Sequence, residues 1–117
     1  MKIGNYQAYR LIARREPFEG SNFYGEWVKD YKEDEEVYVV YSYSTAIAEC
    51  RRGVWIINET RYSITTARHM DYVKRALYAY APEYVSVYHV SRGERLLYDN
   101  IMHSVALDRF DRLVASA

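Results

Sequence analysis

Five polar side chains lie within seven positions where an apolar segment gives way to a predicted helix. They are Ser63, Thr65, Thr66, Arg68 and His69. Backbone N–H groups and the helix dipole attract anions at such a junction, and an arginine beside a histidine adds hydrogen-bond donors. We therefore predict a seat for a phosphate, a nucleotide or a partner carboxylate. Asn58, Thr60 and Arg75 are predicted to belong to the same site.

The same residues also fit a purely structural role. In that interpretation a threonine caps the helix, Ser63 bonds to the backbone of a turn, and His69 packs on the sheet with one ring nitrogen satisfied. The two interpretations differ in whether the cluster converges on an open cleft or disappears into packing.

The other reactive side chains form no catalytic or metal-binding pattern. The three histidines are scattered at His69, His89 and His103, and no cysteine pair or acidic cluster has metal-ligand spacing. Cys50 precedes two arginines, a setting that lowers a thiol pKa and suggests a nucleophile. The alternative for Cys50 is an exposed small residue in a hairpin turn. We predict no metal, no cofactor and no catalytic residue.

The polar cluster must be positioned by residues 37–79, which are predicted to form two β-segments and a helix. Residues 37–48 alternate between two largely apolar faces, which predicts one long central strand. The turn Arg51-Arg52-Gly53 leads into residues 54–57, which are predicted to pair back as an antiparallel hairpin. Thr65 or Thr66 then caps a helix that Pro82 ends, and its core-facing stripe is His69, Val73, Ala76, Leu77 and Tyr80.

The flanking segments complete the predicted fold. A first helix is capped by Asn5 and closed by Pro17, residues 22–28 form a short edge strand, and residues 30–36 form a solvated acidic loop. Residues 84–90 form a strand on which residues 95–98 pair back. A last helix begins at Asp99 or Asn100, with Ile101, Met102, Val105, Ala106, Phe110, Leu113 and Val114 on its apolar face.

The predicted fold class is α+β, with the order α-β-β-β-α-β-β-α. A small antiparallel sheet of about four to five strands packs with about two to three helices. Half of the 117 residues are apolar, and 16 basic side chains balance 16 acidic ones, which predicts one soluble globular domain over residues 1–117. A broad polyanion-binding surface is not expected, because the charges balance. A net charge of zero also gives little repulsion between copies of the chain, so a homodimer is compatible with the composition.

Sequence features also bear on the compartment. The chain has a single cysteine, no apolar core of a secretory signal in its first ten residues, and no apolar run long enough to cross a bilayer. We therefore expect a protein of a reducing cytoplasm that makes no contact with a membrane.

Tyrosine is the compositional outlier, with 14 tyrosines against 3 phenylalanines and 2 tryptophans. Tyrosine is enriched at protein interfaces, where a rigid ring gives a large contact area at low entropic cost. High β-propensity and cross-strand packing explain many of the same tyrosines without a partner. The residues predicted for a protein interface are Arg51, Arg52, Tyr72 and Tyr78.

Parts of the chain carry a resemblance to a known group of proteins. They are residues 41–48 (YSYSTAIA), then Trp55, Asn58 and Thr60, and residues 62–69 (YSITTARH). This signature resembles that of small uncharacterised proteins from bacteriophages and other bacterial mobile elements. Pro17-Phe18 and Gly25-Glu26-Trp27 are similar to their N-terminal half. The resemblance covers roughly residues 15–79 and implies a phage or prophage gene product in the cytoplasm of a bacterial host cell.

The leading functional prediction is a small non-enzymatic accessory protein that docks its tyrosine-rich surface on a host or phage protein. The phage-like resemblance and the chain length suggest an inhibitor of host-defence machinery, such as a CRISPR effector, as its role. Nucleic-acid binding is the second hypothesis, because the pairs Arg14-Arg15, Arg51-Arg52 and Lys74-Arg75 accompany many tyrosines able to stack on bases. The third is an undetected enzyme or a nucleotide-binding module at residues 66–69.

Overall fold

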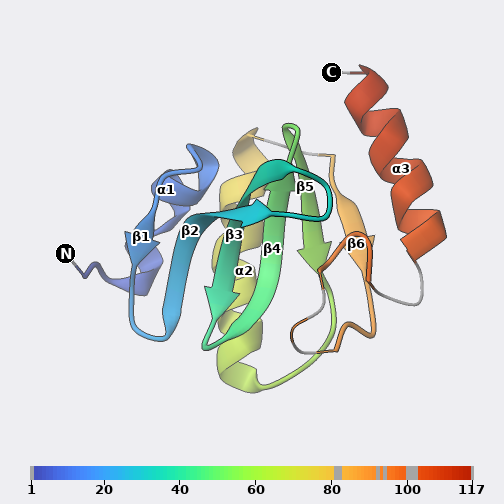
Figure 1. Ribbon diagram of the computed structural model, residues 1–117. Coiled ribbons are helices and arrows are strands. Elements are labelled where there is room, and N and C mark those ends of the chain that lie inside the picture. Colours follow the sequence, from blue (N-terminus) through green and yellow to red (C-terminus); the bar gives the residue numbers. More distant parts are fainter. Residues whose placement is uncertain (1, 81–82, 92, 94, 100–102, 117) are drawn as a thin grey trace.

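A six-stranded mixed sheet forms the centre of the molecule, and its strands follow chain order across it (Figure 1). The computed structural model describes residues 2–80, 83–91, 93, 95–99 and 103–116. The strands are β1 (Phe18–Glu19), β2 (Phe23–Asp30), β3 (Glu35–Ser42), β4 (Thr45–Arg51), β5 (Val54–Asn58) and β6 (Val85–Val87). Neighbouring strands are antiparallel except β5 and β6, which are parallel because α2 (Ile64–Tyr80) crosses over between them.

Helices cover both faces of the sheet. The short helices η1 (Asn5–Gln7) and α1 (Tyr9–Ala13) lie with α2 on one face, where residues such as Ile12 and Leu77 share a core with Trp55. α3 (His103–Ser116) lies on the other face beside β6, and Phe110 packs there with Ile56. Successive residues of β5 therefore serve two separate cores, as expected for a strand covered on both sides. None of the described helices is both long enough and apolar enough to cross a bilayer.

The α+β class predicted from the sequence is confirmed, and the sheet is larger than predicted. It has six strands instead of about four to five, and the pairing of β5 with β6 makes it mixed instead of wholly antiparallel. The core-facing stripe predicted for α2 is confirmed at His69, Val73, Ala76 and Leu77, which are all buried. Pro82 and the side chain of Tyr80 lie outside the described residues.

The predicted long strand over residues 37–48 is wrong, because this stretch forms two strands joined by a tight turn at Tyr43 and Ser44. Tyr43 has a left-handed φ of 57°, and its N–H donates to the Asn22 carbonyl at 2.8 Å. The alternation of apolar side chains did not reveal this turn, because the turn contains no glycine or proline. The turn after Arg51 therefore joins β4 to β5, and the antiparallel pairing predicted for residues 54–57 is confirmed with β4 as the partner.

Predictions in other segments are also corrected. The predicted edge strand over residues 22–28 belongs to β2 from Phe23 onward, and it is not the outermost strand, because β1 pairs with it at Tyr24 and Gly25. Residues 96–98 form a turn and Asp99 a bend, so no strand pairs back here and no helix begins at Asp99. On α3, Ala106 and Phe110 are buried as predicted, whereas Val105 is 61% exposed. Asn100, Ile101 and Met102 lie outside the described residues.

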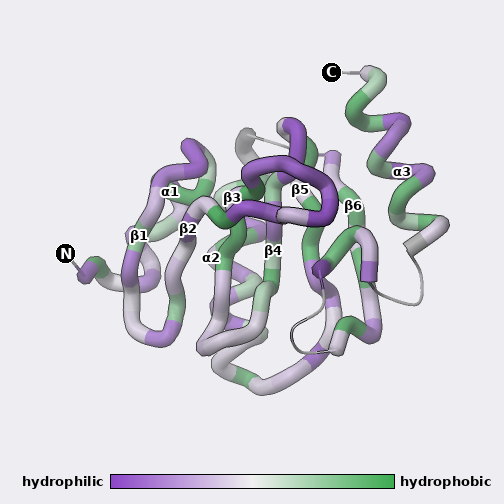
Figure 2. Tube along the Cα trace, in the orientation of Figure 1, coloured by the Kyte–Doolittle hydropathy of each residue, from purple (hydrophilic) through white to green (hydrophobic). Residues whose placement is uncertain are grey.

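The outer part of the β2–β3 hairpin bends across the front of the sheet (Figure 1). Figure 2 shows that this part is strongly hydrophilic, whereas β5 and β6 behind it carry hydrophobic segments. Residues 30, 35 and 36 of the predicted acidic loop belong to the strands, and residues 31–34 form the turn between them. The bend brings the acidic tip of the hairpin toward the β4–β5 turn and the segment after β6.

Candidate functional site

Ser63 caps α2, which corrects the prediction of a threonine cap. The Thr66 N–H donates to Ser63 Oγ at 3.1 Å, and the helix begins at Ile64. Thr65, Arg68 and Arg75 are exposed, whereas Thr66 is buried. The predicted cluster is thus divided between solvent and the interior, and it does not converge on one open cleft.

A buried hydrogen-bond network holds Thr66 and His69. Nδ1 of His69 lies 2.7 Å from Ser42 Oγ, which donates to Thr66 Oγ1 at 3.0 Å. On the other side of the ring, Nδ2 of Asn5 lies 3.3 Å from Nε2 of His69. The imidazole stacks on Phe23 with ring centroids 4.7 Å apart. Sequence reasoning missed Ser42 and Asn5 because they lie 27 and 64 positions from His69.

The protonation state of His69 follows from the orientation of Asn5. The Asn5 amide oxygen accepts the Ser21 N–H at 2.7 Å, which leaves Nδ2 as a donor toward His69. Nε2 of His69 is therefore the acceptor, so the proton of the neutral ring is on Nδ1 and is donated to Ser42. Ser42 cannot pass its own proton to this imidazole, so the two residues do not form a nucleophile and its base.

We expect His69 to titrate below its ordinary pKa of 6.5. Burial lowers this pKa most, and the positive charge of Arg68 lowers it further. Because the folded-state pKa is depressed, the contribution of the neutral ring to stability is present above about pH 6.5 and is lost as the pH falls through the folded-state pKa. An NMR titration of the His69 ring measures this midpoint, and a value of 6.5 or higher would contradict the assigned hydrogen bonds.

Asn58 and Thr60 tie the β5–α2 connection to the segment after β6. Asn58 is fully buried, and its Nδ2 donates to the Ala46 carbonyl at 3.0 Å while its Oδ1 accepts the Thr60 N–H at 3.0 Å. Thr60 Oγ1 accepts the Val90 N–H at 2.9 Å, and the Tyr62 hydroxyl donates to the Val90 carbonyl at 2.7 Å. Both polar side-chain atoms of Asn58 are satisfied within the protein, which supports the structural interpretation for this part of the cluster.

Arg51 is buried, which corrects its assignment to a surface interface. Its side chain is 2% exposed, and its guanidinium bonds carboxylates from three strands: Asp30 at 2.7 Å, Glu35 at 2.8 Å and Glu49 at 2.8 Å. The Tyr98 ring lies against the same guanidinium, with its centroid 5.1 Å away. A buried arginine requires such partners, because an unpaired charge in the interior costs several kcal/mol.

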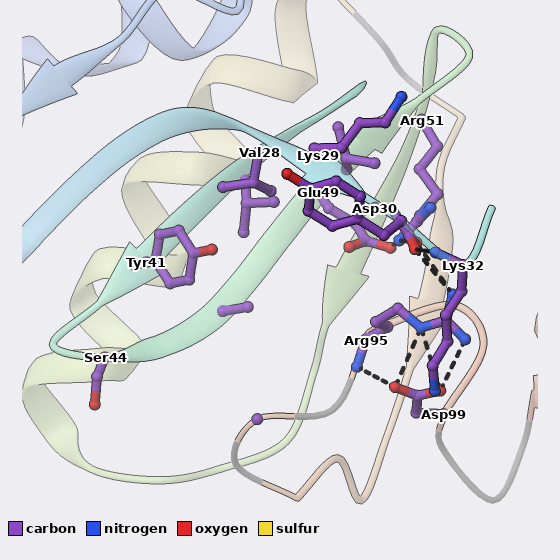
Figure 3. A pocket seen from close by; sticks show the side chains of 15 residues that line it. Val28, Lys29, Asp30, Lys32, Tyr41, Ser44, Glu49, Arg51, Arg95 and Asp99 are labelled. Carbon is purple, nitrogen blue, oxygen red and sulfur yellow. Dashed lines mark hydrogen bonds and ion pairs between the residues drawn. The ribbon is translucent and has the colours of Figure 1, made fainter. Parts of the chain in front are cut away.

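Arg95 extends these contacts from the segment after β6. It lies 3.1 Å from Asp30 and 3.1 Å from Asp99. Figure 3 shows Arg95 beside Asp99, with their contacts drawn as dashed lines. The neighbouring Arg52 is exposed and bonds Glu35 at 3.1 Å. We term this set of ion-paired residues the arginine network: Asp30, Glu33, Glu35, Glu49, Arg51, Arg52, Arg95 and Asp99. It fastens the tip of the β2–β3 hairpin to the β4–β5 turn and to residues 95–99.

Two carboxylates of the arginine network respond in opposite ways to their surroundings. Burial alone would raise the pKa of Asp30, but hydrogen bonds from Arg51 and Arg95 outweigh it and lower the pKa to about 2. At Glu49, burial prevails over the attraction of Arg51 and raises the pKa. Asp30 is therefore the carboxylate most firmly held in its charged form, and it joins both arginines.

An open cavity of about 450 Å³ lies between the β2–β3 hairpin and the residues Gly93, Arg95 and Asp99 (Figure 3). We term it the hairpin pocket. Members of the arginine network, including Asp30, Arg51 and Arg95, form one end of the cavity. Its floor is lined by Val28, Val37, Val39, Tyr41 and Ala46. The cavity therefore combines an apolar patch with many charged side chains, and its volume falls within the range of ligand-binding clefts.

Two hydroxyl groups of the hairpin pocket are unused. Within the part of the chain that the structure describes, neither the Tyr41 nor the Ser44 hydroxyl forms a hydrogen bond. Burial first, and then the negative charge of Glu26, raises the pKa of Tyr41 to about 12, so the phenol keeps its proton and can donate it to an acceptor. The hairpin pocket therefore combines an apolar floor with free hydrogen-bond donors.

Cys50 is buried, which corrects its placement as an exposed turn residue. It belongs to β4 and contributes to the core beneath α2. Burial raises the pKa of its thiol to about 11, although the nearby Arg15 opposes the shift. A thiol with a raised pKa is not an activated nucleophile.

The remaining interface candidates differ in their solvent exposure and in their contacts with other side chains. Arg52 donates to the Tyr98 hydroxyl at 2.9 Å and lies over the Phe110 ring. Tyr72 is half-buried and its ring contacts Phe23, with centroids 5.9 Å apart. Tyr78 is 89% exposed on the outer side of α2. Of these three candidates, Tyr78 presents the largest free surface to a partner.

A family model matches the greater part of the chain. Residues 9–81 match the model described as "Family of unknown function (DUF8033)". No curated protein and no solved structure matches the chain. The matched segment includes the β2–β3 hairpin and Arg51, whereas Arg95 and Asp99 lie beyond it.

Proposed function

We propose that this chain, which belongs to the DUF8033 family, acts by binding another protein and that its hairpin pocket receives an apolar side chain of the partner. The observation that carries this proposal is the combination of an apolar floor with unused hydroxyl groups in a cavity of about 450 Å³. A partner side chain that contacts Val28 and Ala46, the half-buried aliphatic residues of the floor, brings its own backbone carbonyl near donors such as Tyr41. Aromatic groups and preformed pockets supply most of the binding energy at protein interfaces.

The arginine network supports the proposal because it preforms one wall of the hairpin pocket. Its ion pairs are made within the chain, and no described buried side-chain nitrogen or oxygen atom lacks a partner. The wall therefore needs no ligand to neutralise it. A site that keeps its shape without its partner loses little conformational entropy on binding.

A non-enzymatic role is supported by the reactive groups of the described residues. Ser42 and His69 are buried, and the proton on Nδ1 of His69 points toward the serine. Cys50 is buried with a raised thiol pKa. Neither the Ser42–His69 pair nor the Cys50 thiol offers a substrate an accessible, activated nucleophile.

The biological setting that we propose is a bacteriophage or a mobile element acting in the cytoplasm of its bacterial host. The resemblance of residues 15–79 to small proteins from such elements supports this setting. The class of target that we propose is host-defence machinery, including CRISPR effectors, which a small accessory protein inhibits by occupying a contact surface.

Tyr31 and Tyr78 provide a matched test of where the partner binds. Both tyrosines are almost fully exposed, at 86% and 89%, but Tyr31 lines the hairpin pocket and Tyr78 lies on α2. We expect the immobilised protein to capture a defined host protein from a bacterial lysate. Tyr31→Ala is expected to weaken that capture by about tenfold or more, because it removes an exposed aromatic from the contact.

A second variant and a control complete this experiment. Ser44→Trp places a large side chain at an exposed position beside the hairpin pocket and should also abolish capture. Tyr78→Ala should retain the partner, as measured by quantitative mass spectrometry of the bound fraction. Retention by both pocket variants together with loss from Tyr78→Ala would place the contact on α2 and overturn the proposal.

A further inference from the structure

Four exposed arginines lie on the two neighbouring helices α1 and α2. Arg10 and Arg14 belong to α1 and its C-cap, and Arg68 and Arg75 belong to α2, which packs against α1. None of the four forms an ion pair with a described residue. We refer to these residues as the arginine face. Unpaired exposed arginines on adjacent helices form a local positive surface even when the whole chain is neutral.

The positions of the four residues on their helices keep them together. Arg10 and Arg14 are four residues apart, and Arg68 and Arg75 are seven apart, so each pair shares one side of its helix. Asp71 lies between the two arginines of α2 and is exposed with them, which leaves a net positive charge on the arginine face. The chain balances this charge elsewhere, because the arginine network carries five carboxylates against three guanidinium groups.

Exposed tyrosines accompany the arginine face. Tyr6 in η1 is 62% exposed, and Tyr78, three residues beyond Arg75 on α2, is 89% exposed. η1 also packs against α2, so both tyrosines come from elements of this one layer. Exposed aromatic rings beside cationic groups are the combination that binds single-stranded nucleic acid, because the rings stack on unpaired bases while the cations contact phosphates.

We propose that the arginine face binds the backbone of a single-stranded nucleic acid. Arginine suits this role because its planar guanidinium forms paired hydrogen bonds with phosphate oxygens. The exposed tyrosines favour a single strand over a duplex, whose bases are stacked inside the helix and closed to them. This site is separate from the hairpin pocket, which lies on the opposite face of the sheet, and it does not depend on the proposed protein contact.

The number of arginines sets the expected salt dependence. Each phosphate contact on a single strand contributes about 0.7 to the slope of log K against log salt, so four contacts give a slope of about −2.8. Raising the salt from about 50 to about 200 mM should therefore weaken binding about fifty-fold. Removing two contacts should reduce the slope to about −1.4 and the same loss to about sevenfold.

The test is fluorescence anisotropy of a labelled oligothymidine of about 20 nucleotides, long enough to span such a site. Arg68→Ala combined with Arg75→Ala is expected to weaken binding and halve the salt slope. Arg109→Ala combined with Arg112→Ala is the matched control, because it removes two exposed arginines from α3. The control should bind as the unmodified protein does. All four positions are exposed, so both double variants should fold, which circular dichroism checks.

Results of three kinds would overturn this proposal. The first is no binding at low salt, or an equal loss of affinity in the α3 control. The second is equally tight binding of a duplex of the same length, which would exclude a preference for unpaired bases. The third is equal competition by polyglutamate, which would mark an unselective surface for acidic proteins. Tyr78→Ala should weaken oligothymidine binding about tenfold, whereas Tyr31→Ala should not change it, so this proposal and the proposed function fail separately.

Discussion

Replacing Arg51 by methionine is expected to lower the free energy of unfolding by about 3–5 kcal/mol. The substitution leaves the carboxylates of Asp30 and Glu49 buried without their principal cation, while the methionine chain retains part of the apolar volume. Breaking a buried ion pair from one side is costly because the remaining charges stay in a poorly solvated environment. Urea denaturation followed by circular dichroism measures the difference.

Arg52 provides the control for this substitution, because it is the next residue and also pairs with Glu35. Its side chain is 47% exposed, so solvent screens the interaction, and Arg52→Met should cost less than about 1 kcal/mol. Equal losses from the two variants would show that burial does not distinguish the arginines. That result would contradict the central place of Arg51 in the arginine network.

The pH dependence gives a second measure of the same network. Asp30 has a pKa of about 2 in the folded protein against an ordinary value of 3.8, so its stabilising contribution is present above about pH 4 and is lost as the pH falls toward 2. Glu49 acts in the opposite direction, because its raised pKa makes protonation favour the folded state. Without Arg51 both carboxylates resist ionisation, and the stability gap between the variant and the unmodified protein should narrow as the pH falls below about 4.

Replacing Phe23 by alanine is expected to cost about 3–5 kcal/mol of unfolding free energy. The Phe23 side chain is fully buried, and its ring contacts three others: edge-on Phe18 at 5.1 Å, stacked His69 at 4.7 Å and tilted Tyr72 at 5.9 Å between centroids. The substitution removes apolar contacts from β1, β2 and α2 together and leaves a cavity among them. Thermal and urea unfolding measure the loss.

Two further variants separate the parts of this effect. Phe23→Leu keeps most of the buried volume but removes the aromatic contacts, so it should cost less than Phe23→Ala. Tyr31→Ala removes an exposed aromatic and should change stability by no more than about 0.5 kcal/mol. A loss below about 1 kcal/mol for Phe23→Ala would contradict the close packing of Phe23 against Phe18, His69 and Tyr72.

Local patterns were sufficient to predict some elements of this fold. The apolar residues of α2 recur at helical spacing, so its buried face followed from the sequence alone. The β3–β4 turn did not, because Tyr43 adopts a left-handed conformation without a glycine and the strands on both sides are apolar on both faces. The parallel pairing of β6 was also missed, because it depends on where α2 returns the chain.

Prediction of the candidate site failed where its contacts are distant in the sequence. Thr66 and His69 were identified from a local cluster, but their partners Ser42 and Asn5 come from other elements. Arg51 resembled a surface turn residue, and its burial follows from a hairpin tip that folds back over it. The sequence around a charged residue in a turn does not show whether its ion pair is buried or exposed to solvent.

The hairpin pocket has one wall from the β2–β3 hairpin and one from residues after β6. These two walls can therefore change independently among members of the family. The floor and the hairpin wall belong to the segment that matches the family, whereas Gly93, Arg95 and Asp99 follow it. A relative with the same β2–β5 scaffold but another C-terminal third would keep the floor and exchange the facing wall. If the hairpin pocket binds a partner as proposed, such a relative would bind a different partner although its sheet is unchanged.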